Sequence, residues 1–150
     1  MNEENNDGVW KNGTWENGVW EKGRWESGNW MFGIWKSGLW MDGVFSNGVW
    51  KNGTWENGVW EMGRWENGVW KNGTWENGVW ENGTWENGEW NFGIWKGGLW
   101  KNGIWRDGVW DDGVWESGTW LCGFWRSGRW IGGYDINGNY HGPNDSPDKW

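Results

Sequence analysis

The stretch VWKNGTWENGVWEMGRWENGVW, residues 49–70, repeats a five-residue unit that can be written Gly-x-Trp-x-x. Tryptophan recurs every fifth residue from Trp10 to Trp130, with Phe45 as the one replacement, and glycine stands two places before each ring. A period of five matches neither the 3.6 residues of a helical turn nor the simple alternation of a strand. The chain is therefore expected to bend at the same point in every unit.

Each unit is predicted to contain a short strand and a corner. The residue between Gly and Trp is usually β-branched, as in Val49 and Thr54, which favours an extended segment. The two residues after Trp are usually charged and then Asn or Ser, and an Asn-Gly pair such as Asn57-Gly58 is a strong turn signal. Because outward-facing rings would leave charged residues such as Glu56 in a dry interior, Trp must point inward.

These arguments predict an all-β β-solenoid whose core is a set of inward-stacked tryptophans. The mean hydropathy of -1.02 and the 30 glycines would by themselves suggest disorder. The 25 tryptophans, however, provide the large buried area of a folded core. The representative core residues are Trp10, Trp15, Trp20, Trp50, Trp55, Trp60, Trp75 and Trp100.

The number of units in one coil is predicted from longer self-similarity. Residues 49–68 and 69–88 differ at two positions, and residues 9–28 resemble 49–68, which gives offsets of 20 and 40. Residues 29–44 resemble 89–104 at an offset of 60. All are multiples of four units, so the expectation is a four-sided solenoid of about 20 residues per coil. Two alternatives stay open: a flattened coil of two units, and duplication of a four-unit gene segment without a coil of that length.

The repeat resembles the pentapeptide-repeat family, which places a bulky residue at the central inward position and a small one two places earlier. Here Trp and Gly occupy those positions from Gly8 to about Gly133. The resemblance implies a right-handed quadrilateral β-helix, although that family prefers Leu or Phe with Ala, Ser or Cys. The phrase from Trp55 to Trp60 also looks like tryptophan-rich tandem repeats of phage and bacterial structural proteins.

Two coils are expected to carry apolar side chains on their outer wall, at residues 29–48 and 89–108. Such a patch is typical of a protein contact, and the other interpretation is that some of these side chains tuck into corners or lie under the C-terminal tail. The candidate contact residues are Met31, Phe32, Ile34, Leu39, Met41, Phe92, Ile94, Leu99 and Ile104.

The sequence divides into an acidic lead at residues 1–8, the solenoid at 9–133 and a tail at 134–150 that is expected to cap the last coil. The tail is expected to cover Leu121, Phe124 and Ile131. The lead does not resemble a signal peptide and no apolar run could span a membrane, so a cytoplasmic or virion-associated protein is expected.

Enzymatic function is not expected, because the chain has a single histidine, His141, and a single cysteine, Cys122, with no nucleophile and base that stand together. No catalytic, cofactor or metal site is predicted, since Asp107, Asp111 and Asp112 occupy corner positions where Asp replaces Asn. Cys122 is expected to be an exposed thiol.

The predicted function is that of a structural rod that self-associates or forms part of a fibre or assembly, in a phage or on a bacterial surface. The partner is then a further copy or an assembly component. An adhesive module that binds glycan or protein is the alternative, with Phe32, Phe92, Tyr134, Tyr140 and Trp150 as available rings. A third interpretation is an acidic mimic of DNA that binds a topoisomerase. Residues 9–133 hold 15 acids and 12 bases, a balance of only -3, whereas a mimic of duplex DNA should carry its charge along the whole rod, so this interpretation ranks third. Nucleic acid itself is not expected as a partner of a chain whose net charge is -8.

Overall fold

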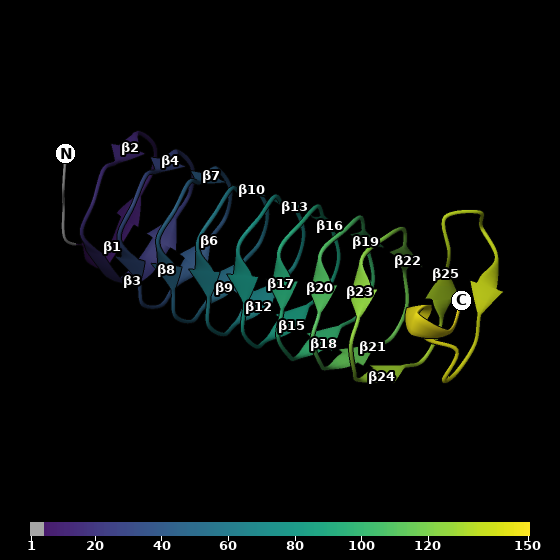
Figure 1. The fold of residues 1–150 in the computed structure, drawn as a ribbon. Helices are drawn as coiled ribbons and strands as arrows, with labels where there is room; N and C mark the ends of the chain where they lie inside the picture. The colour runs from purple at the N-terminus through teal and green to yellow at the C-terminus, as the bar shows by residue number, and fades with distance from the viewer. Residues whose placement is uncertain (1–4) are drawn as a thin grey trace.

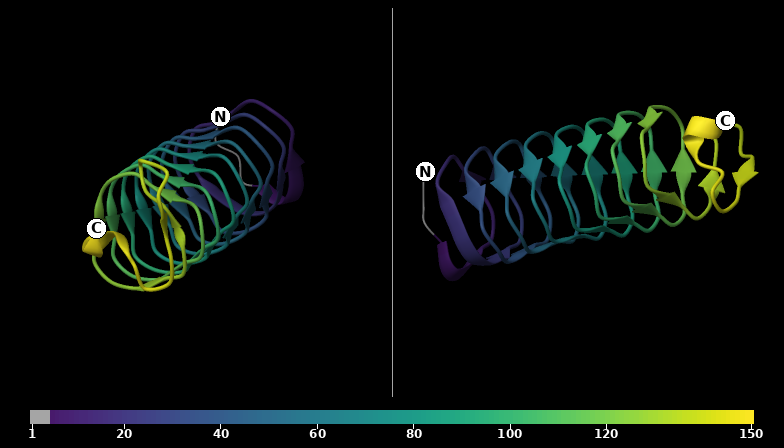
Figure 2. Two further views of the ribbon diagram at one scale, coloured as in Figure 1. Left: turned by 90° about the vertical axis from the view of Figure 1, so that its right-hand side faces the viewer. Right: turned by 60° about the horizontal axis from the view of Figure 1, so that its bottom comes forward.

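The computed structural model describes residues 5–150, which form one rod of stacked parallel coils. Successive coils lie side by side along the rod, with the N-terminal end at one tip and the C-terminal tail at the other (Figure 1). Viewed obliquely toward its C-terminal end, the rod shows the coils as closed loops of similar size, one behind another (Figure 2). The prediction of an all-β solenoid with inward tryptophans is confirmed.

The rod has three faces, each built from one strand per coil. The strands of the first face are β1 (Asn5–Trp10), the second half of β3 (Val19–Trp25), β6 (Leu39–Trp40), β9 (Thr54–Trp55), β12 (Val69–Trp70), β15 (Thr84–Trp85), β18 (Leu99–Trp100), β21 (Val114–Trp115) and β24 (Arg129–Trp130). The strands of the second face are β2 (Thr14–Trp15), β4 (Asn29–Trp30), β7 (Val44–Phe45), β10 (Val59–Trp60), β13 (Thr74–Trp75), β16 (Glu89–Trp90), β19 (Ile104–Trp105), β22 (Thr119–Trp120) and β25 (Gly133–Tyr134). The strands of the third face are the first half of β3, β5 (Ile34–Trp35), β8 (Val49–Trp50), β11 (Arg64–Trp65), β14 (Val79–Trp80), β17 (Ile94–Trp95), β20 (Val109–Trp110) and β23 (Phe124–Trp125).

Each coil consists of three five-residue units, so the predicted four-sided coil of four units is wrong. Trp60 pairs with Trp75 and Trp65 pairs with Trp80 in parallel register, which is a step of 15 along the chain. The same register excludes the alternative coil of two units and the quadrilateral shape implied by the family resemblance. The offset of 60 that linked residues 29–44 to 89–104 equals four such coils, whereas the offsets of 20 and 40 do not correspond to whole coils. Those two offsets therefore reflect duplicated sequence, which was the second of the open alternatives.

Three columns of rings fill the triangular interior and account for its size. Trp60 stacks on Trp75 with ring centroids 4.8 Å apart and planes 5° from parallel. Around the coil, Trp75 meets Trp80 edge to face at 5.9 Å and 73°. Offset stacking and edge-to-face contact are the two arrangements that the indole quadrupole favours. Because three rings meet in this way at every level, the coil closes after three units and the core from Trp15 to Trp115 is fully buried.

The glycine of each unit is required by the spacing between coils. Gly73 has a φ of +122°, and a Cβ added there would lie 2.4 Å from the carbonyl oxygen of Gly58. This close approach lets the carbonyl of Gly58 accept a hydrogen bond from the amide of Thr74 at 2.9 Å. The carbonyl of Trp60 likewise accepts one from the amide of Glu76 at 2.7 Å. Each unit is thus tied to the previous coil twice outside its short strand pairing.

The corners supply further hydrogen bonds. The Asn47 side-chain oxygen accepts the amide proton of Gly48 at 2.7 Å, which explains why Asn or Asp often precedes glycine. Some indole N–H groups donate to a corner carbonyl of the next coil, as Trp30 does to Asn47 at 3.2 Å. Others, such as those of Trp60 and Trp75, are buried without a hydrogen-bond partner. Corner carbonyls therefore bind the indole N–H groups in only part of the rod.

The C-terminal tail closes one end of the rod. Strand β26 (Tyr140–His141) pairs antiparallel with β25, and the 3₁₀ helix η1 (Pro147–Lys149) lies against β23. The Asn144 amide donates to the carbonyl of Trp130 at 2.9 Å, and the Trp150 ring meets the Trp130 ring edge to face at 5.5 Å. Trp130 is consequently 1% exposed, although Phe124 remains 73% exposed and is not covered as expected.

Candidate interaction surface

The outward residues of the third face are almost all apolar. They are Val19, Ile34, Val49, Arg64, Val79, Ile94, Val109 and Phe124. The valines and Ile34 are half-buried among one another, because neighbouring coils bring each β-branched side chain beside the next. This face is therefore an apolar sheet surface along the rod that only Arg64 interrupts.

A row of larger side chains borders this face at its corner with the second face. Every second coil contributes an apolar side chain, and we call this row the ridge: Phe32, Met62, Phe92 and Cys122. The coils between them carry Asn17, Asn47, Asn77 and Asp107 at the same position. The ridge therefore consists of knobs that alternate with gaps, and the gaps repeat every two coils.

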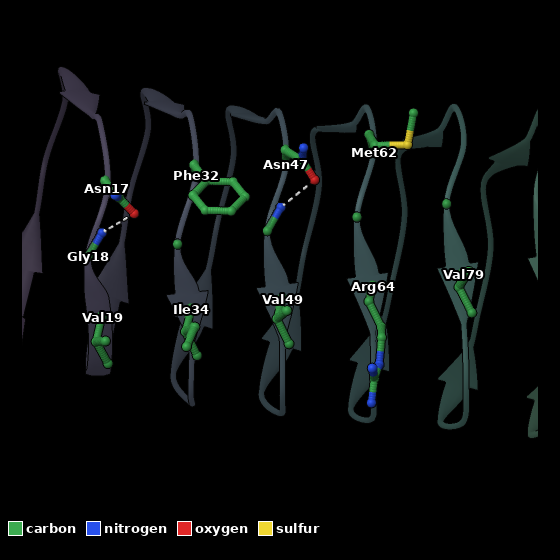
Figure 3. A pocket seen from close by; sticks show the side chains of 14 residues that line it. Asn17, Gly18, Val19, Phe32, Ile34, Asn47, Val49, Met62, Arg64 and Val79 are labelled. Atoms are coloured by element: carbon green, nitrogen blue, oxygen red, sulfur yellow. Dashed lines mark hydrogen bonds between the residues drawn. The ribbon is translucent and has the colours of Figure 1, made fainter.

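A groove of about 670 Å³ lies between the ridge and the outward side chains of the third face, from Val19 to Phe124, which we call the apolar row. It crosses five coils, and its floor is formed by glycines such as Gly33, Gly48 and Gly63, which have no side chain to fill it. Figure 3 shows Phe32 and Met62 above this floor, with Asn47 between them and Ile34, Val49 and Arg64 below. The groove is open to solvent and apolar on both sides.

Charged side chains border the opposite edge of the third face. This charged row consists of Glu21, Lys36, Lys51, Glu66, Glu81, Lys96, Asp111 and Arg126. Neighbours in the row pair across coils, with Lys36 to Glu21 at 3.4 Å and Lys51 to Glu66 at 3.6 Å. Arg64 leans out of the third face to reach Glu66 at 3.1 Å and Glu81 at 3.0 Å. A coil of 20 residues would have placed Lys51 over Lys71, but residues 15 apart are stacked, so Lys51 lies beside Glu66 instead.

The predicted contact residues are distributed around the rod instead of forming one patch. Ile34 and Ile94 lie on the third face, and Phe32 and Phe92 lie on the ridge beside them. The others lie elsewhere: Leu39 and Leu99 on the first face, Ile104 on the second, Met31 at the corner of the ridge and Met41 at the corner between the first and second faces. The two sets are four coils apart in the same columns, where three coils were expected.

The structure also places the residues considered for chemistry. Asp107 and Asp112 accept the amide protons of the glycines that follow them, at 2.8 Å each, and Asp111 pairs with Arg126 at 3.0 Å. Cys122 is an exposed free thiol on the ridge. Within residues 5–150, no group of three or more His, Cys, Asp and Glu side chains is arranged to hold a metal ion. In the same part of the chain, no helix has the length and apolar character needed to cross a membrane.

His141 is held between two carboxylates inside the tail. Its Nε2 lies 2.9 Å from Asp135 and its Nδ1 lies 2.8 Å from Asp145, while the Trp150 ring stacks on the imidazole at 3.9 Å. The hydrogen bonds to Asp135 and then Asp145 raise the pKa of His141 above 6.5. The bond from His141 and the backbone amide of Asn139 lower the pKa of Asp135 from 3.8 to about 2. The cluster connects the two halves of the tail.

We expect the His141 ring, the only imidazole in the chain, to titrate with a pKa above 6.5 in an NMR pH series. Because the folded tail favours the protonated ring, this contribution to stability is full below pH 6.5 and is lost as pH rises through the raised pKa. The Asp135 contribution is present above pH 3.8 and is lost as pH falls through about 2. Asp135→Asn should lower the pKa of His141, and a wild-type value at or below 6.5 would show that the carboxylates do not hold the ring.

The ridge and the apolar row were not recognised from the sequence, although a signal was present. Reading the chain at intervals of 15 places Val19, Ile34 and Val49 in one column, and reading it at intervals of 30 places Phe32, Met62 and Phe92 in another. Neither the comparison with models of known protein families nor the comparison with curated proteins found a match for this chain.

Proposed function

We propose that this protein is a non-enzymatic rigid rod that takes part in an assembly by lateral contact through its third face. The observation that carries the proposal is the apolar row from Val19 to Val109, which only Arg64 interrupts and which the ridge borders. Contiguous exposed apolar surface of this kind is unusual on a monomer and is typical of protein contacts. A phage or bacterial surface assembly is the setting that the repeat pattern favours.

The core supports the rigidity that such a role needs. Each ring is held by a stacked neighbour on the coils before and after it and by edge contacts within its own coil, as for Trp75 with Trp60, Trp90, Trp70 and Trp80. Interiors packed in this way have low compressibility and transmit strain. A rod of this construction keeps the spacing of its outer side chains fixed over its whole length.

Two matched variants test the lateral contact. Val79 on the third face and Val69 on the first face both occupy the half-buried position before a core tryptophan in an Asn-Gly-Val-Trp sequence. Light scattering over a concentration series should show association of the wild type, and Val79→Lys should abolish it while Val69→Lys leaves it intact. Equal behaviour of the two variants, or a wild type that stays monomeric throughout, would contradict lateral contact through the third face.

An adhesive role is the second candidate, and the exposed rings of the ridge are the observation that favours it. Phe32 is 50% exposed and Phe92 is 51% exposed, and Tyr134 contacts Tyr140 in the tail at 5.3 Å. A screen against glycans should detect binding that Phe32→Ala weakens if this role is correct. The DNA-mimic interpretation is less well supported, because the charged row alternates in sign instead of presenting a line of acids.

A further inference from the structure

We propose that the third face binds a second copy of this chain, with the two rods antiparallel and in one defined register. The inference rests on the lateral contact proposed above and adds its partner, orientation and alignment. In this arrangement a two-fold axis runs across the face, at right angles to the rods. The axis therefore brings ridge against ridge and charged row against charged row.

The ridge is complementary to itself in this arrangement. Its knobs occur on every second coil. An antiparallel copy that sets one knob over a gap therefore sets every other knob in the overlap over a gap as well. In the proposed register Met62 of each copy lies over Asn47 of the other, in the gap between Phe32 and Met62 at the edge of the groove. Phe32 then faces Asn77, and Phe92 faces Asn17. The gaps of each ridge are thus filled by the knobs of the other.

Of the registers in which the two ridges interleave, the charged row favours one. From Glu21 to Lys96 the row reads acid, base, base, acid, acid, base, and its reverse has the opposite sign at every position. The same register that seats Met62 over Asn47 places Glu21 opposite Lys96, Lys36 opposite Glu81, and Lys51 opposite Glu66.

The two nearest registers that interleave the ridge bring like charges together. A shift of two coils in one direction places Lys51 opposite Lys96, and the same shift in the other direction places Glu21 opposite Glu66. Like charges that face one another across an interface select against such wrong alignments. The ridge and the charged row lie on opposite edges of the face. Among the interleaved registers that overlap six coils or more, only the proposed one pairs opposite charges at every overlapping position of the charged row.

The surface between these edges fits a dry contact. The side chains that meet there are Val19 with Ile94, Ile34 with Val79, and Val49 with Arg64. The Arg64 guanidinium already bonds Glu66 and Glu81 at the charged edge, so its aliphatic stem is the part that faces Val49. The face therefore buries no unpaired charge at its centre.

The size of the contact predicts a reversible dimer. Six coils at about 4.8 Å by one side of five residues at about 3.3 Å give a footprint on the order of 500 Å² per copy, against about 800 Å² for a standard interface. Growth end to end is not an equivalent route, because the tail covers Trp130 at the C-terminal end. Association is therefore expected to stop at pairs and to depend on concentration.

Charge reversal tests the register. Glu21 and Lys96 are five coils apart in one chain, at about 24 Å, so they can meet only between copies. Sedimentation equilibrium should show that Glu21→Lys and Lys96→Glu each weaken the dimer by roughly tenfold, and that the double variant restores it. Lys11→Glu, at the corner between the first and second faces, is the control and should leave the dimer unchanged. A double variant no tighter than the single ones would overturn the register.

Disulfide trapping reads the orientation directly, in a Cys122→Ser background. Lys36→Cys and Glu81→Cys, prepared separately with a mass tag on one and then mixed, should form a mixed disulfide faster than either forms one with itself. In the proposed dimer, identical positions lie three coils, or about 14 Å, apart along the rods, which is beyond disulfide reach. Self-disulfides in excess would overturn the antiparallel register while leaving lateral association standing. A wild type that remains monomeric would overturn both proposals.

Discussion

Trp75→Ala is expected to lower the free energy of unfolding by about 3–5 kcal/mol, the range for removing a large buried aromatic ring. The Trp75 side chain is fully buried and lies between the rings of Trp60 and Trp90, with centroids 4.8 Å away on both sides. Removal leaves a gap in a column that cannot collapse, since each neighbour is held by the backbone pairing of its own coil. Urea denaturation followed by far-UV circular dichroism measures the loss.

The matched control for this variant is Trp75→Phe. Phe45 occupies the same column and stacks on Trp60 at 4.1 Å and on Trp30 at 5.5 Å, so the column accepts a smaller ring. The Phe variant should therefore lose less than half of what the Ala variant loses. Since a repeat rod unfolds in part by local opening, protection of the amides around residues 60–90 should fall most in hydrogen exchange. Unchanged unfolding of Trp75→Ala would mean that the stacked rings do not stabilise the rod.

Gly73→Ala is expected to destabilise the rod by about 3 kcal/mol or more, because two separate costs add at this position. A side chain at a φ of +122° is strained, and its Cβ would lie 2.4 Å from the carbonyl oxygen of Gly58. That oxygen belongs to the backbone of the previous coil and also accepts the hydrogen bond from Thr74. The coil would have to separate locally, and thermal unfolding should begin at a lower temperature.

Gly97→Ala is the control, because Gly97 stands at a corner position that usually holds Asn or Ser. It has no positive φ, and a Cβ there would meet only the Glu81 carbonyl oxygen at 3.5 Å, an ordinary contact. This variant should have wild-type stability or slightly more, since alanine restricts the unfolded chain. Equal losses for Gly73→Ala and Gly97→Ala would show that the spacing between coils is not what requires glycine.

The sequence was sufficient to predict the strand, the corner and the inward ring of every unit. Those features depend on residues within one unit, such as Asn57-Gly58 for the turn and Trp60 for the core, and local chemistry determines them. The number of units per coil depends instead on how rings from different units meet around the axis. No residue encodes that number alone, because every unit presents the same Trp and Gly to the interior.

The error in coil length also concealed the surface. With four units per coil, Val19 would share a column with Leu39 and Val59, whereas the three-unit coil places it in one column with Ile34 and Val49. The apolar third face and its ridge are properties of that column and cannot be assembled without it. The outward direction of Phe32, Phe92 and Ile94, which are exposed, follows from the unit alone and does not depend on the coil length.

The three-sided coil has a consequence for how such a chain can change by duplication of its gene. Any inserted number of whole units continues the core, but only a multiple of three units returns the following residues to their original faces. Residues 49–68 and 69–88 are near-identical copies, yet Val59 lies on the second face and its counterpart Val79 lies on the third. Copies of one segment thus became parts of different surfaces. Lengthening by tandem duplication can therefore create new binding faces while the stabilising interior stays the same.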